Sequence, residues 1–240
     1  MSPLLIPIAI EWVILVTTLA PLVLVGRFDA RPKLGLTIWF GSLLSSGLAA
    51  AIALTVAISS IFTTYAKLLD SPFGSTDWQS TLLVSFAPWI ILAISGVALA
   101  LINQRLEPLI SVARESKPLI DAASKPWMTF EGHEVFTIEL PIFLAATVRG
   151  RILISKVAAE ALDEHELQAV LRHEVGHIRG RHNALKQLAS LVRLLSPWLT
   201  ASKALVLEVD RLAEFDADRF ATKRIDEKVL RETRARFVAL

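Results

Sequence analysis

The chain has 240 residues, 53% of them hydrophobic, and a formal net charge of +2 at pH 7. It contains no cysteine, which excludes disulfides and thiolate metal sites, so any metal must be bound by histidine and carboxylate side chains. A net charge this small gives no indication of nucleic-acid binding, whereas the high apolar content favours a membrane protein.

Three long apolar segments predict transmembrane helices, at residues 4–25, 34–61 and 81–103. Each reaches the length of about 20 residues that a helix needs to cross a bilayer. The first segment lacks the basic start and the small-residue cleavage site of a signal peptide, so we expect it to remain in the protein. We therefore expect a transmembrane region over residues 1–105 and a second domain over residues 106–240.

The charges between these segments predict their orientation. Residues 27–33 hold three basic residues and one aspartate, residues 67–77 hold one lysine and two aspartates, and Arg105, Arg114 and Lys117 follow the third segment. The positive-inside rule then puts the N-terminus outside and the second domain in the cytoplasm. The expected location is the inner (plasma) membrane, crossed several times.

The second domain starts with a polar linker, which we expect to be helical, at residues 106–125. Segments rich in β-branched and aromatic residues then predict a small β-sheet, with strands at residues 135–140, 142–148 and 151–155 and a turn at Arg149–Gly150. The edge of such a sheet could bind substrate as an added strand. Alternatively, the sheet could only cover the helix that follows it, and the sequence leaves both possibilities open.

Residues 173–177 read HEVGH, an instance of the HExxH pattern. On a helix, positions i and i+4 share one face, so His173 and His177 can direct two imidazoles at one zinc ion. Glu174 can then act as general base on a water activated by the ion. Without this chemistry, the same residues would be an ordinary polar helix face.

The surrounding residues favour a helix over the whole stretch from His165 to Leu195. Asp163 is a plausible N-cap, and Glu166 three residues later completes a capping box. Gly176 is a weak helix former, which another backbone approaching closely would explain.

A catalytic zinc site needs a third protein ligand, and Glu214 is the strongest candidate. Ser196–Pro197 predicts a break, so the chain can form a helical hairpin with arms of roughly 30 and 26 Å, which brings Glu214 level with the two histidines. Asp218 lies one turn further on the same face, where it could hold the distal N–H of a zinc histidine. This hairpin also argues against a fourth membrane crossing by residues 185–207.

His182 is the alternative third ligand, although it comes one residue too early for the HExxHxxGxxH pattern of other zinc proteases. A shift of one residue turns a helical side chain by about 100°, which makes this assignment weaker. No tyrosine is available near the motif to stabilise an oxyanion, since Tyr65 lies at the end of an apolar segment. His182, Arg211 or Arg219 would have to serve instead.

The stretch ILISKVAAEALDEHELQAVLRHEVGHIRGRH and the later EFDADRFA resemble the membrane-embedded zinc gluzincin metallopeptidases, of the BlaR/MecR type or of the HtpX and CAAX-prenyl-protease type. The likeness covers roughly residues 130–225. It implies one Zn²⁺ per chain bound by His173, His177 and Glu214. It further implies Glu174 as the catalytic acid/base and Asp218 as a residue supporting the ligands.

We therefore expect a mainly α membrane protein, with three transmembrane helices followed by an α+β zincin-like domain that has a small β-sheet and an active-site helical hairpin. Its expected function is zinc-dependent cleavage of peptide bonds in regulatory or quality-control proteolysis. The expected partners are a protein or peptide substrate, such as a membrane protein or a transcriptional repressor, and the lipid bilayer. The alternative is a non-catalytic membrane sensor or scaffold with a regulatory zinc site, although such a site has no use for Glu174.

Overall fold

The computed structural model describes residues 5–69, 86, 90, 93, 100–107, 118 and 120–237. The chain forms two compact units, Met1–Val23 with Ile38–Leu109, and Leu24–Thr37 with Ile110–Leu240. We expected residues 24–37 to belong to the transmembrane region, but they are part of the second unit. The expected span at residues 81–103 and the linker at residues 106–125 fall largely outside the described residues.

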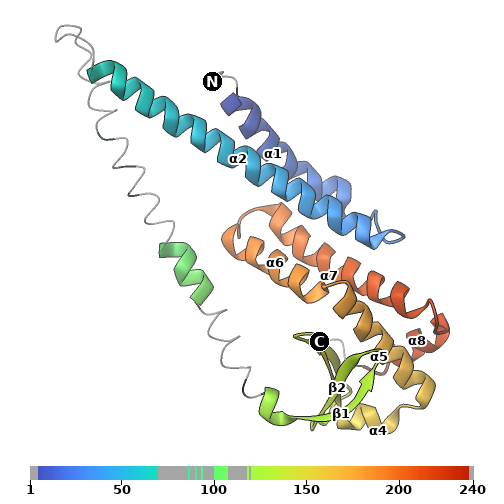
Figure 1. Cartoon of the computed structure of the whole chain (residues 1–240). Helices are drawn as coiled ribbons and strands as arrows, with labels where there is room; N and C mark the ends of the chain where they lie inside the picture. Colours follow the sequence, from blue (N-terminus) through green and yellow to red (C-terminus); the bar gives the residue numbers. More distant parts are fainter. Residues whose placement is uncertain are drawn as a thin grey trace. The chain divides into compact units, whose positions relative to one another are not determined.

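The first unit contains helix α1 (Leu5–Leu24) and most of helix α2 (Pro32–Leu69). The two helices lie side by side, and the indole nitrogen of Trp12 donates a hydrogen bond of 3.2 Å to the hydroxyl of Ser45 (Figure 1). Both are long and apolar enough to cross a membrane. Large apolar side chains on them are exposed, such as Leu22 and Leu44 at 76% each, which suggests a membrane protein because water does not favour such a surface.

The second unit contains a four-stranded sheet of order β1-β2-β4-β3, whose strands are Ser124–Phe130 (β1), His133–Ile138 (β2), Ala145–Val148 (β3) and Arg151–Ser155 (β4). The β2–β4 pair is parallel and the other two pairs are antiparallel. The predicted turn is confirmed, with Arg149 and Gly150 both in the left-handed region at φ 53° and 81°. Strand β3 begins at Ala145, three residues later than the start expected at residue 142.

After the sheet, the described residues of this unit form the helices α4 (Lys156–Ala161), α5 (Glu164–Arg179), α6 (His182–Leu195), α7 (Thr200–Ala221) and α8 (Glu227–Arg234). The predicted capping box of Asp163 and Glu166 is confirmed at the start of α5. The expected continuous helix from His165 to Leu195 is wrong, because Arg181 takes a left-handed conformation (φ 51°) that separates α5 from α6. Helices α6 and α7 form the expected hairpin (Figure 1).

The core of this unit lies between the sheet and α5, where Ile152 and Ile154 of β4 pack with Leu171 and Val175. Helix α7 approaches the other side of α5. A Cβ on Gly176 would lie 2.9 Å from the Cα of Ala217, so the glycine permits the close approach of another backbone that we expected.

Residues 24–37 pack on α7 within the same unit. The backbone N–H of Gly26 donates to the buried carboxylate of Glu208, and Arg211 pairs with both Glu208 and Asp29. Further along α7, Arg219 donates to the carbonyl oxygen of Ala30. These contacts make the loop between α1 and α2 a structural part of the second unit.

Candidate metal centre

Three potential metal ligands converge where α5 faces α7. His173 and His177 lie one turn apart on α5, with their Nε2 atoms 3.0 Å from each other. From α7, Glu214 places Oε2 3.4 Å from Nε2 of His173 and Oε1 3.5 Å from Nε2 of His177. One donor atom from each residue lies within 4.8 Å of the others, so the group could hold a metal ion. Two imidazoles and one carboxylate are the donor set of a catalytic zinc site.

The other ring nitrogen of His173 also faces a carboxylate. Nδ1 of His173 lies 2.8 Å from Oδ1 of Asp218, one turn beyond Glu214 on α7. Arg234 of α8 contacts the second oxygen of Asp218 and donates a 3.0 Å hydrogen bond to Oε2 of Glu214. Asp218 therefore lies beside the distal ring nitrogen of a candidate ligand, and Arg234 contacts both carboxylates.

His182 lies beside His177 rather than at the point where the three ligands meet. Its Nδ1 is 2.9 Å from Nδ1 of His177, and its Nε2 is 3.2 Å from Oδ2 of Asp216. Its ring is fully buried. This arrangement disagrees with His182 as an alternative ligand and gives it a contact with a candidate ligand instead.

Glu174 is buried next to the two histidines and accepts a 2.7 Å hydrogen bond from the hydroxyl of Thr147 on β3. Burial raises the pKa of Glu174, and the charge of His173 and the Thr147 hydrogen bond oppose this increase. The backbone carbonyl of Thr147 in turn accepts a 2.6 Å hydrogen bond from the side-chain amide of Asn183. The candidate base is thus held between β3, α5 and α6.

The pKa values of the three candidate ligands indicate that, near neutral pH, only His173 carries an additional proton. Burial alone would lower the pKa of His173, but hydrogen bonds that its ring donates to the carboxylates of Asp218 and Glu214 outweigh burial and raise this pKa to about 9. Burial and the neighbouring charge of His173 lower the pKa of His177 to about 3. For Glu214, burial is outweighed by the His173 hydrogen bond and the two imidazoles, which hold its pKa below the usual range. Without metal, the protonated His173 ring provides the positive charge that the neighbouring carboxylates stabilise.

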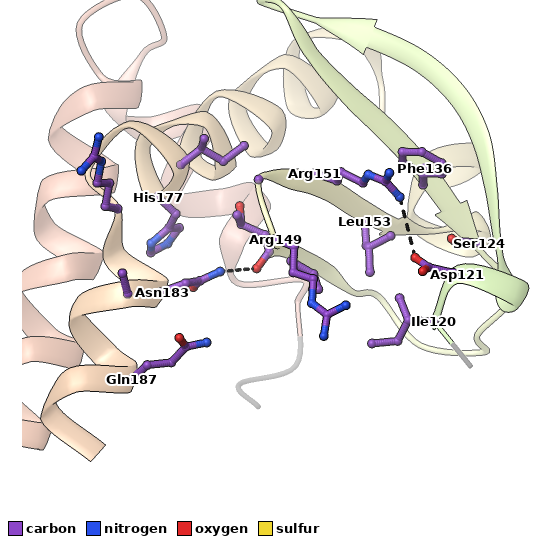
Figure 2. A pocket seen from close by; sticks show the side chains of 16 residues that line it. Ile120, Asp121, Ser124, Phe136, Arg149, Arg151, Leu153, His177, Asn183 and Gln187 are labelled. Atoms are coloured by element: carbon purple, nitrogen blue, oxygen red, sulfur yellow. Dashed lines mark hydrogen bonds and ion pairs between the residues drawn. The ribbon is translucent and has the colours of Figure 1, made fainter. Parts of the chain in front are cut away.

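Two cavities share lining residues at this centre. One of about 640 Å³ is lined by β3 and by His173, Glu174, His177, Lys186 and Glu214. The other, of about 710 Å³, extends past His177 and Asn183 toward Arg149 and Arg151 at the β3–β4 turn (Figure 2). Both are lined in part by Thr147, His177 and Asn183.

The other expected oxyanion partners do not line these cavities. Arg211 and Arg219 instead contact Asp29 and Ala30 in the loop between α1 and α2. Tyr65 lies in the part of α2 that belongs to the first unit. The cations that line the cavity of the metal centre are Lys186, whose Nζ is 3.2 Å from Oε1 of Glu214, and Arg234.

Sequence reasoning missed four residues of this centre, Thr147, Asn183, Lys186 and Arg234. A signal existed only for Asn183, which occupies the position where other zinc proteases carry a third histidine. Arg234 lies 20 residues from Glu214 in the sequence, and no pattern links the two.

Residues 142–204 match the sequence model of Peptidase family M48. None of the curated proteins matches the chain. The family match supports a zincin-type metallopeptidase and includes β3, the HEVGH residues and α6. Glu214 and Asp218 lie beyond the matched range. Their place beside the histidines is seen in the structure, where both side chains extend from α7 to His173.

Proposed function

We propose that the protein is a membrane-bound, zinc-dependent endopeptidase in which His173, His177 and Glu214 bind one zinc ion. The observation that carries this proposal is the convergence of the three donors directly beside a buried glutamate, with His177 lining two cavities. The family match supports the same class of enzyme. A structural metal site would be closed and would not need a neighbouring carboxylate.

The chemistry follows from the positions of the side chains. A zinc ion bound at this centre supplies a Lewis acid that polarises the scissile carbonyl and acidifies water. Glu174 takes the proton from the attacking water and passes it to the leaving amine. The Thr147 hydroxyl holds one oxygen of Glu174, which leaves the other oxygen for the proton transfer.

We further propose that substrate binds in an extended conformation along β3. Within the described part of the chain, β3 is an edge strand of the sheet, and residues on it line both cavities. A peptide added there would pair with backbone groups of the strand and pass Glu174. The bond between Asn183 and the carbonyl of Thr147 fixes the strand at this point.

The membrane location rests on the two apolar helices and on the loop between them. Because residues 24–37 and the candidate peptidase domain form one unit, we propose that both lie on the same side of the membrane. Helix α2 has 38 residues, or about 57 Å, and could cross the bilayer in full. A third span at residues 81–103 would then return the chain to this side, which the basic residues of the loop identify as the cytoplasm.

The competing function is a membrane sensor or scaffold with a regulatory zinc site. Substitution of Glu174 by Gln separates the two, since it keeps the shape of the side chain and removes the base. We expect Glu174→Gln to retain about one zinc per chain and to lose cleavage of an unfolded protein such as casein by a factor of 100 or more, on the order of what a general base contributes. Unchanged cleavage by this variant would rule out the proposed reaction. Absence of cleavage in the zinc-loaded wild type would favour the sensor.

A further inference from the structure

His182 is a buried polar residue for which the proposed reaction has no use. Its ring is completely buried, and it is not among the residues that line the two cavities described above. Both of its nitrogens nevertheless face polar partners, His177 at 2.9 Å and Asp216 at 3.2 Å.

The positions of the protons follow from the role of His177. Its Nε2 faces His173 and Glu214, so this nitrogen must keep its lone pair free in order to bind a metal. The proton of neutral His177 is then on Nδ1, and this N–H donates to Nδ1 of His182. As a result, His182 carries its own proton on Nε2, where it donates to the carboxylate of Asp216. One arrangement of protons therefore satisfies all of these contacts.

The two candidate ligands are thus supported in parallel ways. Asp218 contacts His173 directly, whereas Asp216 reaches His177 through the ring of His182. Asp216 and Asp218 are two residues apart on α7, so their side chains point about 200° apart around the helix. Asp216 therefore leaves the helix away from the ligand group, and the imidazole of His182 spans the remaining distance.

The backbone is adapted to this ring. A Cβ on Gly180 would lie 2.1 Å from Nε2 of His182, far inside contact distance. Gly180 has φ −75° and ψ −8°, which any residue can adopt, so the glycine is needed for space and not for its conformational freedom. Arg181 then takes its left-handed conformation, which starts α6 at His182.

We propose that His182 is a positioning residue for the metal ligand His177, that Asp216 holds it in the correct tautomer, and that Gly180 makes room for its ring. This inference rests on the metal centre proposed above. Groups that orient a zinc-bound histidine typically change metal affinity by about 10- to 100-fold.

The test measures the zinc dissociation constant of the full-length chain in detergent, by competition with a chromophoric chelator. We expect His182→Ala and Gly180→Ala each to weaken zinc binding by about 10- to 100-fold, while both still bind about one zinc at saturation. In the double variant, Gly180→Ala should add nothing to His182→Ala, because no ring remains to be displaced. His182→Gln retains an acceptor and a donor and should recover part of the affinity. Replacement of the exposed His165 by Ala is the matched control and should have no effect.

A second readout separates positioning from a purely structural role. In protein loaded with Co²⁺, the visible absorption bands should shift in the His182 and Gly180 variants, since the geometry around His177 changes. Thermal unfolding of the metal-free variants shows that they are folded.

Zinc affinity of His182→Ala within twofold of the wild type would overturn the proposal, as would additive effects of the two substitutions. Complete loss of zinc at saturation would instead make His182 a ligand. None of these outcomes depends on peptide cleavage, so the Glu174→Gln experiment decides the proposed function separately.

Discussion

At the scale of single residues, the candidate centre consists of a few polar side chains that are each held by another. Arg234 holds Glu214 and Asp218, Thr147 holds Glu174, and His182 contacts His177. Such support fixes side-chain orientation before a metal or substrate binds, which lowers the cost of reaching the reactive geometry.

Replacement of Thr147 by Val tests how the base is held. Because the hydrogen bond from Thr147 lowers the pKa of Glu174, its removal should raise this pKa and shift the acidic limb of the kcat/KM profile to higher pH. A hydrogen bond to a charged group is worth about 1.5–3 kcal/mol, so activity near neutral pH should fall about tenfold or more. Thr147→Ser keeps the hydroxyl and is the matched control. An unchanged pH profile in Thr147→Val would show that the contact does not affect the base.

The pKa of His173, raised to about 9, predicts how metal binding depends on pH. Zinc needs the neutral imidazole, so below pH 9 a proton must leave for each zinc bound, and zinc affinity should increase about tenfold per pH unit between pH 7 and 9. Calorimetry in buffers of different ionisation enthalpy counts the protons released. Asp218→Asn removes a hydrogen bond that raises this pKa and should reduce proton release near pH 9, where about half of the wild-type His173 is protonated. Equal release by both proteins would contradict the assigned pairing.

At the scale of helices and strands, much of the centre could be predicted because the signals are local. The capping box at Asp163 fixes the start of α5, and the distance from His177 through Pro197 to Glu214 is a count along two helical arms. The break at Arg181 could not be predicted, since a non-glycine residue in a left-handed conformation is disfavoured and persists only because the surrounding fold holds it there. The ring of His182, packed against Gly180, is part of that fold.

The close approach of α5 and α7 predicts the effect of a single methyl group at Gly176. Alanine is a better helix former than glycine by about 1 kcal/mol, yet its Cβ would lie 2.9 Å from a backbone atom of Ala217, so the helices must move apart. Overpacking of this kind costs about 1–3 kcal/mol. We expect Gly176→Ala to lower the thermal midpoint and to weaken zinc binding, because Glu214 moves with α7. Gly47→Ala in α2, where a Cβ meets nothing within 4 Å, is the control. Stabilisation by Gly176→Ala would contradict the packing described.

At the scale of the whole molecule, the apolar helices can be predicted from the hydropathy of the sequence. The packing of residues 24–37 on α7 cannot be predicted in this way. Asp29 and Arg211 are 182 residues apart in the sequence, and neither belongs to a pattern that indicates a partner. Lys33, in the first turn of α2, lies 3.9 Å from Asp216, the residue that contacts His182. Docking of this kind depends on the assembled surface of α7, which no local signal in the sequence describes.

Single cysteines can test which side of the membrane each part occupies, because the chain has no cysteine of its own. Ala30→Cys in the loop and Glu160→Cys in the peptidase domain should both react with a membrane-impermeant maleimide in inside-out vesicles. Lys67→Cys, near the other end of α2, should be protected there and react in right-side-out vesicles. Labelling of Ala30→Cys and Glu160→Cys from opposite sides would contradict the proposed topology.

The central claim is that α7 supplies the third ligand to the two histidines of α5, and zinc binding by two carboxylate variants of α7 tests it most directly. Glu214→Ala removes the proposed ligand, whereas Asp210→Ala removes a carboxylate one turn away that lines the same cavity and also contacts Lys186. At a buffered free zinc concentration that saturates the wild type, we expect about one zinc per chain in the wild type and in Asp210→Ala, and almost none in Glu214→Ala. Full zinc content in folded Glu214→Ala would contradict the proposed metal centre.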